Sequence, residues 1–235
     1  MPVISLAALK GGVGKTTSAI YLSAVSARTG TPTLLVDANP DGSAATWVEL
    51  ATKEGWINGV EILEAPSERL LSRALEGSSG PDELIVVDTA PNNSTMTQLA
   101  VDRADAVIVA TRAGGIEIDR VAATLHLIPE GRRHGVVVCA AVTGSRALVD
   151  TVTGWRNAGV PVWGAVPQRV GIGAAMTAPL HLTGLVAYAE ILKRAVGEDS
   201  VVGERVDVPA GGPGEPVVNV SPADGAVGDE EEQQV

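Results

Sequence analysis

Short apolar segments alternate along this chain with longer stretches whose apolar positions recur every three or four residues. Seven such segments, rich in β-branched residues, occupy residues 3–9, 33–36, 59–63, 84–87, 106–111, 135–142 and 162–166. They are nearly continuous in hydrophobicity, as strands covered by helices on both faces are. The alternation therefore predicts an α/β fold with a doubly wound, mainly parallel β-sheet flanked by helices.

The C-terminal part of the chain changes character after Gly197. Before it, helical spacing predicts a last helix over about 182–195, with an apolar face made of Leu182, Leu185, Ala189, Leu192 and Val196. Beyond it, residues 198–235 contain a Gly-Gly-Pro-Gly run and end in a cluster of acidic residues. We expect a folded domain over 1–197 and a disordered acidic tail over 198–235, because the tail is too polar and too broken by Pro and Gly to pack.

Most of the negative charge lies in that tail. The formal net charge is −11, and residues 198–235 hold ten acidic residues against one arginine, which leaves the domain near −2. Nucleic acid is therefore not excluded as a partner. The single cysteine, Cys139, lies in an apolar run, so a disulfide framework within one chain is excluded and we expect a core thiol. No apolar stretch approaches the ~20 residues that span a membrane, and a strand begins at residue 3, so we expect a cytoplasmic protein without membrane contact.

The first predicted strand leads into a glycine-rich loop, Lys10-Gly-Gly-Val-Gly-Lys-Thr-Thr17, that opens a helix. The strict pattern G-x-x-x-x-G-K-[ST] fails because Leu9 replaces its first glycine, but the strand before and the helix after supply the structural context of a phosphate loop. The backbone N–H groups of the loop then point inward and cradle phosphate oxygens. This cradle is predicted to comprise Gly11, Gly12, Val13 and Gly14.

The residues at the end of the loop have predicted contacts with ATP and Mg²⁺, the two expected cofactors. Lys15 reaches the β- and γ-phosphates, the Thr16 hydroxyl ligates magnesium, and Thr17 helps to hold the α-phosphate. The pattern thus predicts a P-loop NTPase.

Two aspartates end later strands of the predicted sheet. Because the carboxyl ends of parallel strands meet at one edge, Asp37 and Asp88 are expected beside the phosphate loop. Asp37 is a candidate to hold a magnesium-bound water or to orient its loop, and Asp88, which closes the run Leu84-Ile-Val-Val, has the Walker B arrangement of a magnesium-binding carboxylate. For either aspartate taken alone, a turn or helix cap is the alternative.

The loop with two lysines resembles the deviant Walker A motif of the ParA/MinD family of dimeric ATPases. The resemblance implies that Lys10 reaches across a dimer interface to the partner's nucleotide, and that ATP drives formation of a homodimer. It also extends to residues 166–175, which look like the family segment that lines the adenine pocket, with Pro167 and Gln168 as base contacts.

The segment from Asp37 to Asp41 is similar to the family's second motif, Asp-x-Asp-Pro-Gln-Gly, whose second aspartate positions the attacking water. Asn39 stands at that position. An amide orients water but cannot take its proton at neutral pH, so we expect slow ATP hydrolysis that a partner stimulates. Asp41, at the glutamine position, is an alternative to Asn39.

Within the family, the chain resembles the short ParA proteins that partition plasmids or chromosomes. One cysteine disfavours a nitrogenase-type reductase, and the acidic C-terminus disfavours a MinD-like membrane helix. The resemblance implies a nucleoid-associated ATP-bound dimer that binds DNA non-specifically and a ParB-like adaptor that triggers release. A positioning ATPase for another cargo and a metabolic P-loop ATPase are the alternatives. Candidate DNA contacts are Arg132, Arg133, Arg146, Arg156, Arg169, Lys193 and Arg194.

Overall fold

A computed structural model describes residues 2–76, 83–91, 94–114, 118–173 and 177–197. The predicted acidic tail, 198–235, lies outside the described residues. In the described part of the chain, seven strands form one sheet in the order β3-β2-β4-β1-β5-β6-β7, and each neighbouring pair is parallel. The strands are β1 (Val3–Ala7), β2 (Thr33–Ala38), β3 (Val60–Glu64), β4 (Leu84–Thr89), β5 (Ala106–Arg112), β6 (Arg133–Ala141) and β7 (Val162–Pro167).

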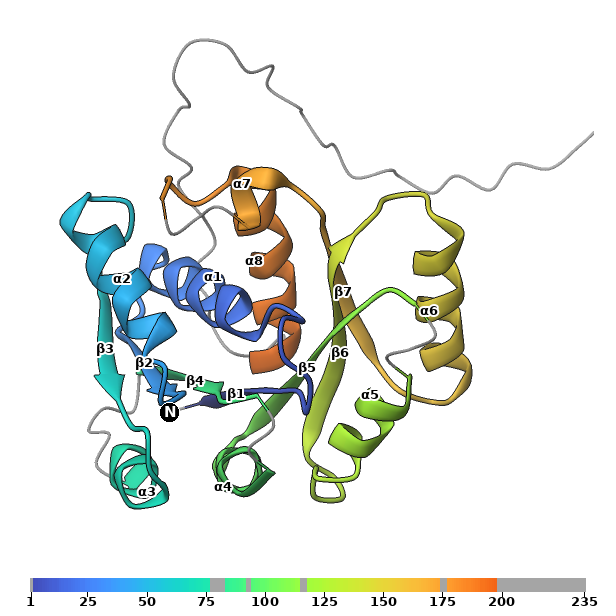
Figure 1. Cartoon of the computed structure of the whole chain (residues 1–235), viewed down its shortest axis with the longest axis horizontal. Coiled ribbons are helices and arrows are strands. Elements are labelled where there is room, and N and C mark those ends of the chain that lie inside the picture. Colours follow the sequence, from blue (N-terminus) through green and yellow to red (C-terminus); the bar gives the residue numbers. More distant parts are fainter. Residues whose placement is uncertain (1, 77–82, 92–93, 115–117, 174–176, 198–235) are drawn as a thin grey trace, which may run out of the picture.

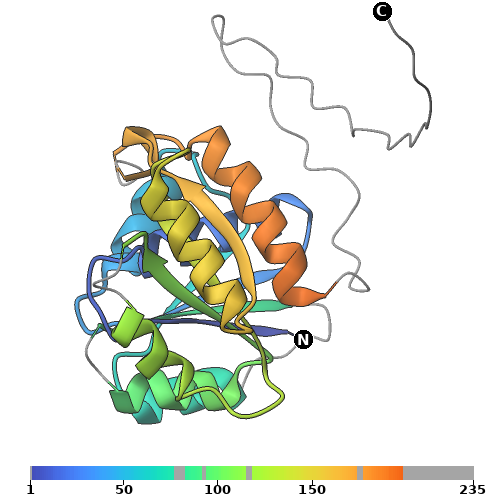
Figure 2. The same ribbon diagram turned by 90° about the vertical axis from the view of Figure 1, so that its right-hand side faces the viewer.

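Helices cover both faces of this sheet, as the sequence predicts (Figure 1). One apolar cluster joins the sheet to α1 (Lys15–Arg28), α2 (Ser43–Lys53) and α8 (Leu182–Val196). A second cluster joins the other face to α3 (Glu68–Glu76), α4 (Ser94–Arg103), α5 (Ile118–Leu125) and α6 (Arg146–Asn157). The short α7 (Val170–Gly173) follows β7, and Figure 2 shows β7 between α6 and α8. The doubly wound α/β fold is therefore confirmed.

The central strands differ from the edge strand in burial. Every residue of β1 and of β4 is buried, in keeping with their continuous hydrophobicity. At the edge, β3 has a neighbour on one side only, and its Leu63 is 41% exposed. β1 ends at Ala7, two residues before the predicted end of the strand, because the backbone leaves the sheet there to form the glycine-rich loop.

The last helix is present, but its buried face is rotated from the predicted one. Its buried residues are Gly184, Leu185, Tyr188, Ile191, Leu192 and Ala195. The prediction that Leu182 lies on the buried face is wrong, because this residue is 44% exposed. The packing of α1 sets the rotation, because the Tyr21 and Tyr188 rings lie 5.2 Å apart and Gly184 leaves room for Tyr21.

The sheet topology brings the predicted site together. From β1 the chain passes to β2 and the edge strand β3, returns to place β4 between β2 and β1, and then adds β5, β6 and β7 on the other side of β1. The loops that follow β1, β2 and β4 thus leave the same edge near the point where the winding reverses, which is where ligands bind in open α/β sheets. Among the described helices, none has the length and apolar character that crossing a membrane requires.

Candidate functional site

The glycine-rich loop between β1 and α1 depends on two left-handed glycines. Gly12 has φ 72° and Gly14 has φ 102°, a region that L side chains rarely adopt. A Cβ on Gly14 would also lie 3.1 Å from the Cβ and Sγ of Cys139. Both the backbone conformation and this close contact therefore disfavour a larger residue at position 14. The Ser18 amide donates to the Gly14 carbonyl at 2.9 Å, which starts α1 directly behind the loop. Its N-terminal N–H groups are thus aimed at the cradle.

Lys15 lies inside the loop rather than in solvent. Its side chain is buried, and Nζ donates to the carbonyl oxygens of Ala8 at 3.2 Å and of Lys10 at 3.3 Å. Burial lowers the pKa of this ammonium, and the nearby Asp88 carboxylate opposes that fall. Lys15 therefore holds the two ends of the loop's first segment while facing the cradle with a desolvated positive charge.

Asp88 and Thr16, two of the predicted magnesium ligands, are brought together. Thr16 Oγ1 donates to Asp88 Oδ2 at 2.7 Å, and Asp88 is fully buried at the end of β4. Its other oxygen, Oδ1, is buried without a hydrogen-bond partner. Burial raises the pKa of the Asp88 carboxyl to about 7; the Thr16 hydrogen bond lowers it, Asp37 raises it further and Lys15 lowers it. A buried acceptor without a donor is the kind of atom that a cation or its water shell satisfies.

Asp37, the third predicted magnesium ligand, has a different environment. It is paired in register with Asp88 on the adjacent strand, and it is also buried. Its Oδ1 accepts the Asn39 amide at 3.0 Å, while Oδ2 accepts the amides of Ala44 and Ala45, both at 2.9 Å. The carboxylate thus caps the N-terminus of α2 from outside the helix. The sequence predicted that Asp37 holds a magnesium-bound water or orients its loop, with a turn or cap as the alternative, but it did not identify α2 as the helix that is capped. The contact with magnesium stays a prediction.

Asn39 lies in a tight turn held by Asp37. The Asn39 carbonyl oxygen accepts the Gly42 amide at 3.0 Å, and Oδ1 accepts the Asp41 amide at 3.3 Å. Asn39 is half-buried, whereas Asp41 is exposed. The side chain therefore braces its own turn in this conformation, and its predicted contact with the attacking water remains a prediction, as does the alternative role of Asp41.

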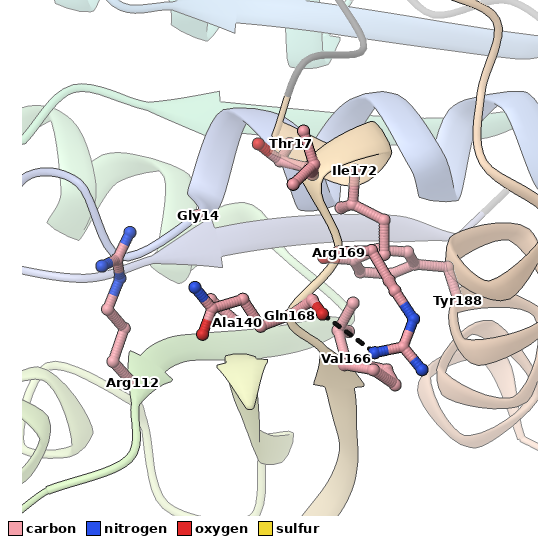
Figure 3. A pocket seen from close by; sticks show the side chains of 11 residues that line it. Gly14, Thr17, Arg112, Ala140, Val166, Gln168, Arg169, Ile172 and Tyr188 are labelled. Carbon is pink, nitrogen blue, oxygen red and sulfur yellow. Dashed lines mark hydrogen bonds between the residues drawn. The ribbon is translucent and has the colours of Figure 1, made fainter. Parts of the chain in front are cut away.

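A cavity of about 530 Å³ adjoins the phosphate loop. It is lined by Gly14, Thr17, Arg112, Ala140, Val166, Pro167, Gln168, Arg169, Val170, Ile172 and Tyr188 (Figure 3). The structure thus places the predicted base contacts Pro167 and Gln168 in the same hollow as the loop residues Gly14 and Thr17. The Gln168 amide donates to the Ala141 carbonyl at 2.9 Å, which joins this wall to the end of β6.

Three lining residues were not predicted from the sequence. Arg112 ends β5, and Ala140 adopts φ 48° where the pairing of β6 and β7 shifts register. Tyr188 Oη lies 2.8 Å from Ser18 Oγ, which in turn lies 3.6 Å from Cys139 Sγ. Only Tyr188 left a signal, since its spacing from Leu185 and Leu192 is that of a helix face. Cys139 is the buried core thiol that was predicted.

The predicted DNA contacts do not gather at one place. Arg133 starts β6, and Arg194 donates to the Trp163 carbonyl at 2.6 Å near the start of β7, so both lie at the amino ends of the strands. Arg146 and Arg169 instead follow the carboxyl ends of β6 and β7. Arg146 pairs with Asp150 and Lys193 pairs with Glu190. The contact of these residues with DNA stays a prediction.

Sequence comparison finds relatives among partition and positioning proteins. A sequence model of the CobQ/CobB/MinD/ParA nucleotide-binding domain (CbiA) matches residues 4–179. The chain is 33% identical over 160 residues to maintenance of carboxysome distribution protein A of Gloeobacter kilaueensis, covering 66% of this chain and 71% of that protein. It is 30% identical over 155 residues to the chromosome-partitioning ATPase Soj of Thermus thermophilus, covering 55% of this chain and 62% of that protein.

Structural comparison agrees on the fold. The septum site-determining protein MinD of Pyrococcus horikoshii, solved with Mg-ADP, superposes with a TM-score of 0.69 over 87% of this chain and 99% of that chain. The two sequences are 17% identical, so this likeness shows the fold alone.

Proposed function

This chain belongs to the CobQ/CobB/MinD/ParA nucleotide-binding family, and on that premise we propose that it is a ParA-type partition ATPase. In this proposal two chains bind ATP, form a homodimer and hold DNA without regard to its sequence. A ParB-like adaptor then stimulates hydrolysis, the dimer releases DNA, and repeated cycles segregate a plasmid or chromosome. The protein is associated with the nucleoid only in its ATP-bound state.

The observation that carries the proposal is the arrangement of the two lysines around one loop. Lys15 lies buried within the cradle and binds the Lys10 carbonyl, so the two lysines are joined through the backbone. A single lysine suffices to contact the phosphates of a bound nucleotide. The second, Lys10, at the front of the loop, is the residue that the family resemblance directs toward a partner subunit.

The residues present fit ATP and magnesium. The loop has glycines at the two positions where φ is positive, and the adjoining cavity of about 530 Å³ is of the size that ligand pockets have. Asp88 Oδ1 is a buried acceptor without a partner, beside the Thr16 hydroxyl. We assign Thr16 and Asp88 to the magnesium site, with Asp37 behind them. Magnesium supplies neutralisation of charge on the phosphate oxygens during transfer.

The chain's own residues then divide the work of the switch. The Lys15 ammonium exchanges backbone carbonyl partners for phosphate oxygens, which are charged and bind it more strongly. Gly14 and Thr17 line the cavity on the side of the loop, and Pro167 and Gln168 would hold the base there. Asn39 orients water without accepting its proton, so hydrolysis is slow until the adaptor binds.

The test is binding to a random-sequence DNA duplex with ATP, with ADP and without nucleotide, at two salt concentrations, while light scattering reports the mass. We expect a dimer that binds DNA with ATP only, and an affinity that falls steeply with salt because phosphate contacts release counterions. DNA binding that ignores the nucleotide, or a monomer in every state, would refute the switch.

Two variants and one control make that test specific. Lys15→Ala should abolish ATP binding, whereas Lys10→Ala should bind ATP but stay monomeric and leave DNA free. Lys53→Ala is the matched control, because Lys53 is an exposed lysine at the end of α2 and should behave as the unmodified chain does. A Lys10→Ala protein that still forms the dimer would exclude the cross-subunit contact.

A second candidate is a positioning ATPase for a cargo other than DNA. The observation that favours it is the 33% identity to a protein named for maintenance of carboxysome distribution. The same experiment separates the candidates: an ATP-dependent dimer that binds no DNA in any state indicates another cargo. ATP binding without any dimer instead indicates the metabolic alternative.

A further inference from the structure

Three hydrogen bonds contribute to holding the front of the phosphate loop, where the chain leaves β1 and reaches Lys10. Two of them come from Lys15 Nζ, which holds the carbonyls of Ala8 and Lys10. The third is the Leu9 amide, which donates to Thr124 Oγ1 at 3.3 Å across 115 positions of sequence. Leu9 lies beyond the end of β1, so the sheet ladder no longer takes its N–H.

The environment of the Thr124 hydroxyl favours its role as the acceptor of the Leu9 amide. It lies on α5, only 1% exposed, and its hydroxyl proton is already committed to the Arg120 carbonyl at 2.7 Å. The oxygen lone pairs of Thr124 are thereby turned to accept rather than donate. Leu9 is half-buried, and its N–H has a buried hydroxyl as acceptor, so losing that acceptor has a cost and the position of Leu9 depends on this hydroxyl.

The two kinds of bond respond differently to a nucleotide. Phosphate oxygens compete with the Ala8 and Lys10 carbonyls for the Lys15 ammonium, because charged acceptors form the stronger hydrogen bonds. The Leu9 bond to Thr124 involves no group of the cradle and is not subject to that competition. When Lys15 turns to the phosphates, the Thr124 bond continues to hold the residue directly before Lys10.

We propose that Thr124 is a positioning residue that holds Leu9 in the nucleotide-bound state and so directs Lys10 toward the partner subunit. This inference rests on the cross-subunit role of Lys10 in the proposed function. It gives α5, a helix that contributes no predicted site residue, a defined part in dimer formation.

The test separates ATP binding from dimer formation in Thr124→Val, which keeps the shape of the side chain and removes the acceptor. We expect the affinity of the monomer for a fluorescent ATP analogue to stay within about twofold, and dimer formation with a non-hydrolysable ATP analogue to weaken about tenfold or more. Thr124→Ser, which keeps the hydroxyl, should restore dimer formation. Thr97→Val is the matched control, because Thr97 is buried on α4 and its Oγ1 has no hydrogen-bond partner.

The outcomes distinguish this inference from the proposed function. If the unmodified chain fails to dimerise with the ATP analogue, both fall. If the unmodified chain dimerises, the Lys10→Ala variant does not and the Thr124→Val variant dimerises normally, only the inference about Thr124 is refuted. That inference is also refuted if Thr124→Val weakens ATP binding in the same proportion as it weakens dimer formation.

Hydrogen exchange of the unmodified chain provides a second test that needs no variant. The Leu9 amide should remain protected when the ATP analogue is bound, because its acceptor does not belong to the cradle. Exchange at Leu9 that accelerates about tenfold or more on binding would overturn the inference.

Discussion

Strands β2 and β4 lie side by side and carry buried aspartates, Asp37 and Asp88, at matching positions of the register. Asp37 accepts three backbone amides, two of them from the first turn of α2. Asp88 accepts one hydroxyl, from Thr16, and its Oδ1 is without a partner. The same local sequence, an apolar strand that closes on an aspartate, has therefore produced a structural anchor in one strand and an incompletely satisfied carboxylate in the other.

The difference shows how a buried carboxylate is made available to a ligand. Hydrogen bonds from several backbone amides commit the oxygens of a carboxylate to the fold. Where the fold withholds those donors, ionisation is costly and the oxygen gains most from a cation. We therefore expect substitutions at Asp37 to act mainly on stability and substitutions at Asp88 to act mainly on magnesium-dependent binding.

The largest effect is expected for Asp37→Asn. Asparagine keeps the shape of the side chain, but its NH₂ group replaces an oxygen that accepts a backbone N–H and cannot itself accept that hydrogen bond. The free energy of unfolding should therefore fall by about 2–4 kcal/mol. Urea denaturation measures this, and Asp102→Asn, at an exposed position, should change stability by less than about 0.5 kcal/mol. A stable Asp37→Asn protein that has lost magnesium-dependent ATP binding would invert the comparison.

Asp88→Asn should have the opposite effect on stability. Without nucleotide, removing a buried carboxyl whose ionisation is costly should raise the free energy of unfolding by roughly 1–3 kcal/mol. At the same time, magnesium-dependent ATP affinity should fall about ten- to a hundredfold. Calorimetric titration with and without magnesium checks the second effect, with Asp150→Asn as an exposed control. Unchanged values of both quantities would remove Asp88 from the site.

The pKa of Asp88 makes the comparison depend on pH. Its folded value of about 7 lies above the ordinary 3.8, so the folded state binds this proton more tightly than the unfolded chain does. The cost of ionisation is full above pH 7 and shrinks as the pH falls toward 4, by up to about 1.4 kcal/mol per pH unit. The nucleotide-free protein should therefore gain stability on acidification from pH 8 to pH 5 relative to Asp88→Asn. Parallel denaturation curves with no relative shift would contradict this.

The smallest effect is expected for Asn39→Asp in the turn that Asp37 braces. A carboxylate there can accept a proton from water, so basal ATP turnover should rise by roughly three- to tenfold. Phosphate release under saturating ATP measures it. If turnover stays the same and Asp41→Asn lowers it instead, the water-positioning role belongs to Asp41.

Local pattern was enough to predict the sheet and part of the site. Continuous apolar runs identified all seven described strands, and the glycine spacing located the cradle. Because parallel strands share one edge, the Thr16 contact with Asp88 followed from strand order rather than from sequence proximity. Pro167 and Gln168, which line the cavity together with Gly14, were instead named because residues 166–175 resemble the family segment that lines the adenine pocket.

What escaped prediction depends on geometry between elements. The two bonds from amides of α2 to Asp37 span seven and eight positions and match no capping pattern, since they require the turn at Asn39 to fold back. The rotation of α8 was set by the contact between Tyr21 and Tyr188, and Ala140 takes its positive φ from a register shift in the sheet. The residue types in these segments do not by themselves predict contacts between distant elements.

The packing of Cys139 against Gly14 makes the chain its own reporter of loop movement. This is the sole thiol in the sequence, its side chain is buried, and burial raises its pKa, so an alkylating reagent meets it only after the glycine loop lifts away. The rate of alkylation thus counts spontaneous openings of the cradle without any introduced label. A ligand that stabilises the closed loop will lower the rate at which Cys139 is alkylated, and a ligand that does not stabilise the loop will leave that rate unchanged.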